Sequence, residues 1–204
     1  KRSPAASSWF NLLCTAAVRK MTEKHDILLW QQILAGDEGA FSQLYLAHRP
    51  LLLHYGLRLC QDRALAEECI QDLFCDLYFY KDQRPVIQNI KAYLFISYRR
   101  ELLRMVQKKH KTQSLSVGEG AIDPLVVFSQ EDFLIEKERM AEKQEMLASL
   151  LNELTPRQKE IIYLRYYNGL DNEEISEVLN ISYQVVHNTL YKAFKRLREL
   201  VRVN

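Results

Sequence analysis

Apolar residues recur every three or four positions along most of the chain, a spacing that predicts amphipathic helices rather than strands. Between Asp26 and Lys111 this pattern is almost unbroken. Gly36 ends the first run, and Pro50 either interrupts the next run or starts a further helix. Long helices are predicted from Ala64 to Tyr80 and from Ile90 or Lys91 to Lys111. Strand-like alternation is absent, so this stretch is predicted to be all-α.

A polar tract rich in Ser, Thr, Gly and Asp interrupts the pattern at residues 112–130. Such a composition is typical of a flexible linker between two domains. Its one apolar cluster, Leu125 to Phe128, is either a docking segment or a single helical turn, and the residues leave both interpretations open.

The helical pattern returns at Glu131 and carries clear start and stop signals. Thr155 before Pro156 predicts a helix N-terminus, and Gln158 completes a capping box. Asn168-Gly169 is typical of a helix C-terminus. About four helices are therefore predicted in the second half of the chain.

The last of these helices form a helix-turn-helix pattern. Asp171 to Glu174 is predicted to form a second capping box, and Asn180-Ile181-Ser182 breaks the run, with Ser182 as a new N-cap. A long helix with a helically spaced apolar stripe follows: Val185, Val186, Leu190, Ala193, Phe194, Leu197 and Leu200. Two helices joined by a three-residue turn predict binding to double-stranded nucleic acid.

Side chains early in the second helix of such a motif read base edges, and later cations hold phosphates. The early candidates are Tyr183, Gln184, His187, Asn188 and Tyr191. The later ones are Lys192, Lys195, Arg196 and Arg198. The alternative is a helical hairpin that binds protein.

Net charge is only +2, so the overall balance does not by itself identify a nucleic-acid partner. The distribution is more informative, because basic residues dominate two separate blocks, Arg99 to Lys111 and His187 to Arg202. Acidic residues gather elsewhere, notably at Glu67, Glu68, Asp72 and Asp76.

The two predicted helices around residue 80 differ in character. The first carries an acidic face that includes Gln71 and suits a basic partner protein, although it also fits an ordinary amphipathic helix. The second interleaves Tyr93, Phe95 and Tyr98 with arginines, as in proteins that bind single-stranded DNA. Aromatic residues at this spacing also fit a hydrophobic core.

Other function classes receive little support. Cys14, Cys60, Cys69 and Cys75 lack zinc-ligand spacing, and the last three are expected to be buried, reduced thiols. We find no phosphate-binding glycine loop and no nucleophile–base arrangement, and His48 and His54 are interpreted as structural. No window is long and apolar enough for a membrane span.

Residues 1–20 are set aside from the fold. Met21 is a plausible native start, so we interpret this segment as a non-native or disordered extension, with a signal peptide as the weaker alternative.

Five segments, in this order, resemble bacterial sigma factors of the extracytoplasmic-function (ECF) group within the sigma-70 family. They are Gly36–Phe41, Leu65–Phe74, Lys91–Phe95, Leu154–Gln158 and the helix-turn-helix. The likeness covers roughly residues 26–200, and the segment from Tyr183 to Asn188 is similar to the form common in Bacteroidetes.

The resemblance implies a cytoplasmic bacterial protein that binds the clamp helices and flap of core RNA polymerase and directs transcription initiation at promoters. Residues 21–111 would form an N-terminal domain that binds polymerase and opens the −10 element. Residues 112–130 would be the linker, and residues 131–204 the domain that binds the −35 element. An anti-sigma factor is a further implied partner, and no cofactor, metal or enzymatic activity is expected.

The implied contact residues fall into three sets. Polymerase would contact Glu67, Glu68, Gln71, Asp72 and Phe74. The −10 element would contact Arg84, Asn89, Tyr93, Tyr98, Arg99, Arg100, Arg104 and Lys108. The −35 element would contact Ser182, Tyr183, Gln184, His187, Asn188, Tyr191, Lys192, Lys195 and Arg196. The alternative function is a helix-turn-helix repressor or activator that binds operator DNA without polymerase.

Overall fold

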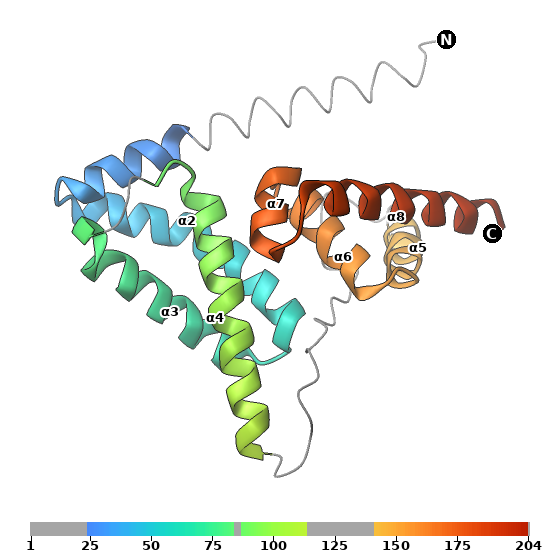
Figure 1. The fold of residues 1–204 in the computed structure, drawn as a ribbon, viewed down its shortest axis with the longest axis horizontal. Coiled ribbons are helices and arrows are strands. Elements are labelled where there is room, and N and C mark those ends of the chain that lie inside the picture. Colours follow the sequence, from blue (N-terminus) through green and yellow to red (C-terminus); the bar gives the residue numbers. More distant parts are fainter. Residues whose placement is uncertain (1–23, 84–86, 114–140, 204) are drawn as a thin grey trace.

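The computed structural model describes residues 24–83, 87–113 and 141–203, and every regular element within these ranges is a helix. The N-terminal half contains a helix at residues 24–34, α2 (Glu38–Cys60), α3 (Arg63–Phe79), the short 3-10 helix η1 (Lys81–Gln83) and α4 (Ile90–Gln113). The C-terminal half contains α5 (Ala141–Asn152), α6 (Pro156–Ile162), η4 (Tyr163–Tyr167), α7 (Asn172–Leu179) and α8 (Tyr183–Val203). Figure 1 shows these two groups of helices side by side. The all-α prediction is confirmed.

Polar side chains fix where the N-terminal helices begin. Asp37 accepts a hydrogen bond from the amide of Ala40 at 3.1 Å, and Asp62 accepts one from Leu65 at 3.1 Å. Asn89 does the same for α4, accepting from Ala92 at 2.9 Å. Each cap satisfies an amide that the helix itself leaves without a partner, so each sets a helix boundary in the sequence.

Helix α2 runs without interruption through Pro50, so the prediction that this proline interrupts or starts a helix was wrong. Proline removes one backbone donor and normally kinks a helix interior. Here buried residues lie on both sides of it, His48 before and Leu52 and Leu53 after, and Pro50 itself is exposed. Packing of both flanks in the same core outweighs the local preference of one residue.

Helices α2, α3 and α4 pack closely at a single glycine. A Cβ atom placed on Gly56 of α2 would lie 1.9 Å from the hydroxyl oxygen of Tyr98 on α4 and 3.2 Å from the Cβ of Ala66 on α3. The Tyr98 hydroxyl donates to the backbone carbonyl of Ala66 at 3.3 Å. The absence of a side chain at residue 56 therefore allows the three helices to meet.

The C-terminal half follows the predicted start and stop signals. Thr155 and Gln158 form the predicted capping box at α6, and Asp171 and Glu174 form the one at α7. Between these helices η4 is a π-helical turn, and Gly169 follows it with φ +67°, a conformation that glycine adopts without strain. These three sequence predictions are confirmed.

Part of the predicted organisation lies outside the described residues. Thr112 and Gln113, the first residues of the predicted linker, continue α4. The rest of the linker, residues 114–130, is not among the described residues, nor are residues 1–20, Arg84 or the predicted helical stretch 131–140. The domain boundaries at the linker stay predictions. In the part of the chain that is described, no helix is long and apolar enough to cross a membrane.

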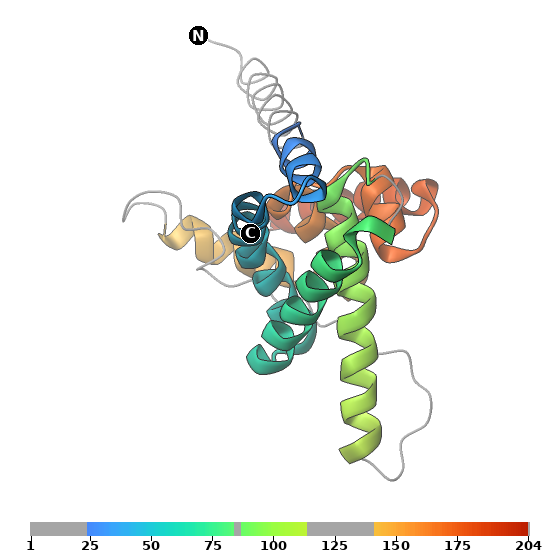
Figure 2. The same cartoon turned by 90° about the vertical axis from the view of Figure 1, so that its left-hand side faces the viewer.

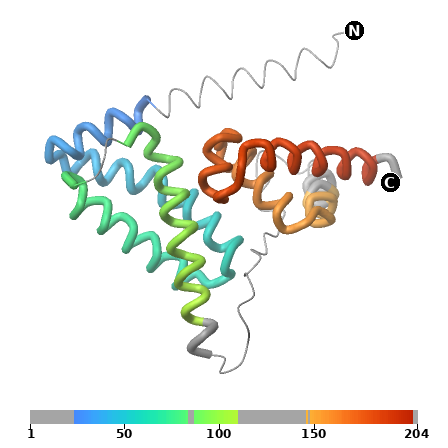
Figure 3. The backbone as a smooth tube through the Cα atoms, viewed as in Figure 1, coloured from blue at the N-terminus to red at the C-terminus, as the bar shows by residue number. Residues whose placement is uncertain are grey.

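The two halves contact each other, which the sequence did not predict. Helix α7 lies along the upper part of α4, as both Figure 2 and the backbone trace in Figure 3 show. The rings of Tyr55 on α2 and Tyr163 on η4 stack with centroids 6.2 Å apart. Buried residues of both halves consequently join in one continuous hydrophobic core.

Candidate nucleic-acid and partner interfaces

Helix α8 begins immediately after the turn that the sequence predicts. Asn180 ends α7 in the left-handed conformation, φ 51°, and the Ser182 hydroxyl accepts from the amide of Val185 at 3.4 Å. The turn sets α8 at an angle to α7, and the inward face of α8 rests on Val186 and Ala193, both fully buried. This is the helix-turn-helix arrangement expected from the sequence.

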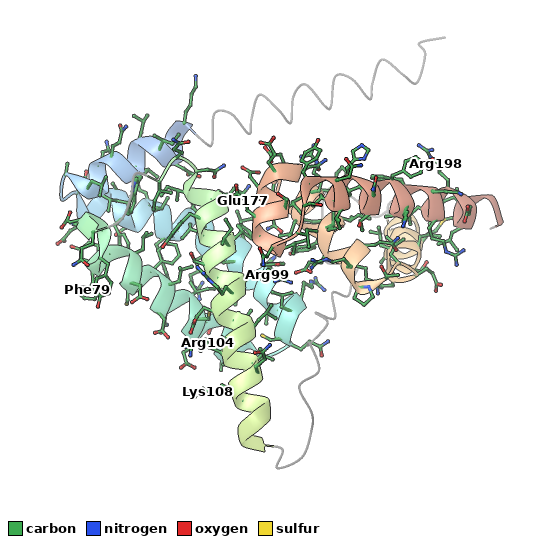
Figure 4. All side chains as sticks on the ribbon, in the orientation of Figure 1. Phe79, Arg99, Arg104, Lys108, Glu177 and Arg198 are labelled. Carbon is green, nitrogen blue, oxygen red and sulfur yellow. The ribbon has the colours of Figure 1, made fainter. Side chains whose placement is uncertain are left out.

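All residues predicted to contact the −35 element lie exposed on or just before α8: Ser182, Tyr183, Gln184, His187, Asn188, Tyr191, Lys192, Lys195 and Arg196. Gln184 donates to Asn188 at 3.0 Å, so these two amides are already oriented relative to each other. The later cations extend along the same helix, with Arg198 at its far end in Figure 4. This helix therefore combines polar groups that can read base edges with cations that can hold phosphates.

Two residues of the predicted apolar stripe do not face inward. Val185 is 46% exposed, and Phe194 is 37% exposed with its ring edge-on to Tyr166 at 5.9 Å. Val185 and Phe194 are next to Val186 and Ala193 in the sequence, which are buried, so the stripe is wider than the surface that covers it.

The predicted polymerase-binding face lies on α3. Glu68, Gln71 and Asp72 are exposed, and Glu67 is half-buried between Arg49 at 3.3 Å and Arg63 at 3.2 Å. These four residues, Glu67, Glu68, Gln71 and Asp72, form what we call the acidic face. Surface ion pairs of this kind contribute little stability, so the face stays available to a partner.

Phe74 does not belong to this face. Its side chain is 2% exposed and packs edge-on against Phe41, with centroids 6.0 Å apart, and Tyr45, at 5.0 Å. The prediction that Phe74 contacts polymerase is corrected here: Phe74 lies on the inward stripe of α3, where burial of an aromatic ring favours the core.

The residues predicted to contact the −10 element are divided among several environments. Arg84 lies outside the described residues. Tyr98 is fully buried in the core, so the prediction that its ring faces DNA is corrected in the same way as for Phe74. Tyr93 is half-buried and packs against the core. Arg100, Arg104 and Lys108 are exposed along α4, and Arg104 pairs with Glu101 on the same helix.

The remaining two residues, Asn89 and Arg99, are bound by the C-terminal half. Arg99 points towards that half, whereas Arg104 and Lys108 lie farther along α4 (Figure 4). The Arg99 guanidinium donates from Nε to Glu160 Oε1 at 2.9 Å and from Nη2 to Oε2 at 3.4 Å. The Asn89 amide, while capping α4 with its oxygen, donates to the carboxylate of Glu174.

Glu160 is the centre of this contact and is fully buried. Besides Arg99, it accepts from the Tyr55 hydroxyl at 2.8 Å and from Arg157 at 3.4 Å. Burial is the main reason that the pKa of Tyr55 stands well above its ordinary value, and the nearby carboxylate raises it further. Burial is the largest single influence on the pKa of Arg99 and lowers it, but the interactions with Glu160 and Tyr55 together outweigh burial, so the pKa is raised.

The sequence contains a signal that Glu160 is buried, although the sequence analysis did not identify this residue. Glu160 is three residues before Tyr163 and four before Leu164, both buried, so it shares their inward face. An acidic residue on an apolar helix face indicates a buried partner cation.

The cysteines fit the prediction only in part. Cys69 is buried, and desolvation raises the pKa of its thiol to about 12. Cys60 is half-buried, and Cys75 is exposed, so the prediction that Cys75 is buried was wrong. Among the described residues no cluster of side chains is arranged to hold a metal ion.

The comparisons with known families agree with this arrangement. Residues 44–112 match the family model of sigma-70 region 2, and residues 144–197 match that of sigma-70 region 4. The first match covers α3, most of α4 and most of α2, and the second covers the helix-turn-helix.

Curated relatives extend over most of the chain. The ECF RNA polymerase sigma factor SigK of Mycolicibacterium vanbaalenii is 26% identical over 200 residues, covering 95% of this chain and 98% of the relative. The ECF RNA polymerase sigma factor SigM of Bacillus subtilis is 24% identical over 158 residues, covering 78% and 93%.

Solved structures support the fold. CnrH, in complex with the cytosolic domain of CnrY, matches with a TM-score of 0.56 and 19% identity over 88% of this chain and 99% of that one. The sigma factor RpoE, in complex with the anti-sigma factor NepR from Bartonella quintana, gives 0.52 and 21% over 80% and 98%.

Proposed function

Since this chain belongs to the sigma-70 family, with relatives in its ECF group, we propose that it binds core RNA polymerase and directs promoter-specific transcription initiation. The observation that carries the proposal is that one chain combines both parts. Its N-terminal half matches region 2, and in its C-terminal half every residue predicted to contact the −35 element is exposed. The similarity of this chain to the form common in Bacteroidetes sigma factors stays a prediction.

We assign recognition of the −35 duplex to α8. Gln184, His187 and Asn188 lie near its start, where a helix in the major groove meets base edges, and amide groups can pair with adenine bidentately. Lys192, Lys195 and Arg196 lie farther along the helix and supply charge for backbone phosphates. Base readers and phosphate contacts would therefore be separate sets on one helix.

We assign polymerase binding to the acidic face of α3 and −10 recognition to α4 and the loop before it. The exposed cations Arg100, Arg104 and Lys108 suit the phosphates of an opened strand. An unstacked base costs a few kcal/mol, roughly, to flip out, so a base-binding site at residues 82–89 would need to repay that cost with specific contacts.

The proposed protein acts through binding and placement rather than catalysis, without a cofactor, in the bacterial cytoplasm. One of its solved structural relatives, RpoE, is bound to an anti-sigma factor. We include such a protein among the partners to test for this chain.

Reconstitution with bacterial core RNA polymerase tests the proposal. We expect the purified chain to bind core enzyme and to permit transcription from a subset of promoters on genomic DNA templates. A repressor or activator would bind duplex DNA but would neither associate with core enzyme nor restore initiation. Failure to associate with core enzyme would contradict the proposal directly.

The acidic face has a matched control. The double variant Gln71→Ala with Asp72→Ala removes one amide and one carboxylate from α3, and should weaken core binding at least tenfold while leaving helical content unchanged. Gln43→Ala with Glu38→Ala removes the same groups from exposed positions of α2 and should leave core affinity unchanged. Equal affinities for the two double variants would reject the assigned face.

A further inference from the structure

We propose that Phe79, at the end of α3, is the aromatic anchor of the polymerase contact, and that its ring enters an apolar pocket on a basic protein surface. This inference rests on the proposed function, because it takes core polymerase as the partner of the acidic face. It adds the residue whose apolar contact holds that partner in place. Phe74, the aromatic residue that the sequence analysis assigned to the contact, is buried and cannot do so.

Phe79 exposes an apolar ring to solvent. Among the described residues its side chain is the most exposed of the large apolar ones, at 75%, and Tyr80 beside it is 51% exposed. A phenylalanine ring has no polar group that water can satisfy, so contact of this area with water is unfavourable. A partner that covers the ring gains the free energy of removing it from water.

Phe79 lies on the same side of α3 as the acidic face. Glu68, Asp72 and Asp76 precede it by eleven, seven and three residues, spacings that return to one side of a helix, and all three are exposed. The line from Glu68 to Phe79 is about 17 Å long, at 1.5 Å per residue. A partner that lies along the acidic face would therefore also meet Phe79.

A row of aromatic rings connects Phe79 to the core. Its ring meets Tyr78 edge-on, with centroids 5.9 Å apart, and Tyr78 lies 4.9 Å from Phe41, which packs against the buried Phe74. The ammonium group of Lys81 lies 4.7 Å above the Tyr78 ring. These contacts restrict the Phe79 ring in the free protein, so covering it costs little further conformational entropy.

The charges near Phe79 favour a basic protein surface over a DNA strand. An exposed ring can also stack on an unpaired base, but a strand brings phosphates with it. Asp76 and Asp82 lie three residues before and after Phe79, and both are exposed. Lys81 lies over the neighbouring tyrosine ring, and Phe79 is at the outer end of α3, well apart from Arg104 of α4 (Figure 4). Carboxylates in this position repel phosphates and attract the cations of a protein.

The acidic face and Phe79 would have different effects on one contact. Exposed charges mainly raise the association rate and orient the partner, and salt screens them. A buried aromatic anchor mainly slows dissociation. Variants of the two kinds should therefore differ in their kinetics and in their dependence on salt.

The test is the affinity of the full chain for core RNA polymerase, measured over a series of salt concentrations. Phe79→Ala should weaken binding by about tenfold or more, mainly through faster dissociation, and by a similar factor at every salt concentration. Asp72→Ala should weaken binding less as the salt concentration rises. Leu46→Ala is the matched control: it removes an apolar side chain that is 69% exposed on α2, and should leave the affinity unchanged.

A conservative substitution separates the anchor from base stacking. Phe79→Leu keeps an apolar side chain and should recover most of the core affinity lost in Phe79→Ala, whereas leucine cannot stack on a base. Because Phe79 is exposed, both variants should keep the circular dichroism spectrum and Tm of the wild type.

Equal core affinities for Phe79→Ala and Leu46→Ala, or a loss in Phe79→Ala that disappears at high salt, would overturn the anchor. Unchanged core affinity together with weaker promoter opening by polymerase carrying Phe79→Ala would assign the ring to DNA and also overturn it. In both cases the wild-type chain still binds core enzyme, so the proposed function stands. If the wild-type chain does not bind core enzyme, the proposed function fails and the anchor fails with it.

Discussion

Helices α4 and α8 are both long, basic and rich in aromatic residues, yet the structure uses them differently. Helix α4 packs against α2, α3 and α7, so its Phe95 and Tyr98 are in the core, its Arg99 is in the contact between halves, and only part of its cationic set faces outward. Helix α8 buries a narrow seam and exposes the rest. Cations and aromatic rings at similar spacing therefore suit ligand binding on α8 and mainly packing on α4.

The largest difference is expected from removing one phenylalanine from each helix. Phe95→Ala on α4 should lower the free energy of unfolding by about 3–5 kcal/mol, because the ring is fully buried beside Tyr55, 5.5 Å between centroids. Phe194→Ala on α8 should cost less than about 1 kcal/mol, because its ring is partly exposed. Urea denaturation of both variants measures the comparison, and similar losses would show that α8 is as deeply packed as α4.

A smaller effect is expected at the closest approach of α2 and α4. Gly56→Ala should destabilise the protein by about 1–3 kcal/mol, since its methyl group would overlap the Tyr98 hydroxyl. Tyr98→Phe removes that oxygen and should recover part of the loss in the double variant. Additive effects in the double-mutant cycle would mean that the two residues do not meet as the structure shows.

Cations on the two helices should also differ towards duplex DNA. Lys195→Ala on α8 should weaken duplex binding across all sequences and reduce the salt dependence of the logarithm of the affinity by about 1. Arg99→Ala on α4 should leave duplex affinity of the free protein unchanged, because Arg99 is bound to Glu160. Fluorescence anisotropy over a series of salt concentrations measures the duplex affinity and its salt dependence for both variants.

Base readers on α8 provide the control for this measurement. His187→Ala and Asn188→Ala should change promoter preference, with about 1–3 kcal/mol of discrimination lost at individual base pairs, while the salt dependence stays as in the wild type. If Lys195→Ala, His187→Ala and Asn188→Ala affect every sequence equally, the division into base readers and phosphate contacts on α8 is wrong.

The smallest effect concerns the far end of α4, where Lys109 bonds Asp62, the cap of α3. The hydrogen bond from Lys109 and the amide of Leu65 hold the pKa of Asp62 below its usual range. A carboxyl whose folded pKa is lowered stabilises the fold above the unfolded pKa of about 3.9, and this stabilisation is lost as the pH falls through the folded value. The Tm difference between wild type and Asp62→Asn should therefore shrink below about pH 4.

Lys109→Met tests the same pair from the other side. The Tm difference between wild type and Lys109→Met should also shrink below about pH 4, but with a smaller amplitude than for Asp62→Asn, because Asp62 remains and still accepts from the amide of Leu65. A Tm difference that stays constant between neutral and acidic pH would show that the ion pair contributes nothing beyond the cap.

Local signals account for what the sequence predicted well. The capping boxes at Thr155 and Asp171 and the turn at Asn180 each involve residues within four positions, so the pattern alone locates them. The family resemblance then supplied the partners. The burial of individual side chains was harder to predict. Phe74 and Tyr98 lie on helices with wide apolar faces, and periodicity does not show which edge of such a face contacts a neighbouring helix.

The contact between halves could not be predicted from local patterns. Arg99 and Glu160 are 61 residues apart, and although Glu160 lies on an apolar helix face, no local pattern identifies Arg99 as its partner. The pairing depends on how two separately predicted groups of helices pack, which the order of motifs does not specify. Pro50 is a second example. Its local preference predicts a helix break, but packing of the residues on both of its sides keeps α2 continuous.

The bond between Asn89 and Glu174 has an electrostatic consequence. Each α-helix carries partial positive charge at its N-terminus, and the first turns of α4 and α7 meet at this bond. The Glu174 carboxylate counterbalances both ends while the halves are together. The carboxylate therefore lies where a backbone phosphate would otherwise be a natural partner for the start of α4.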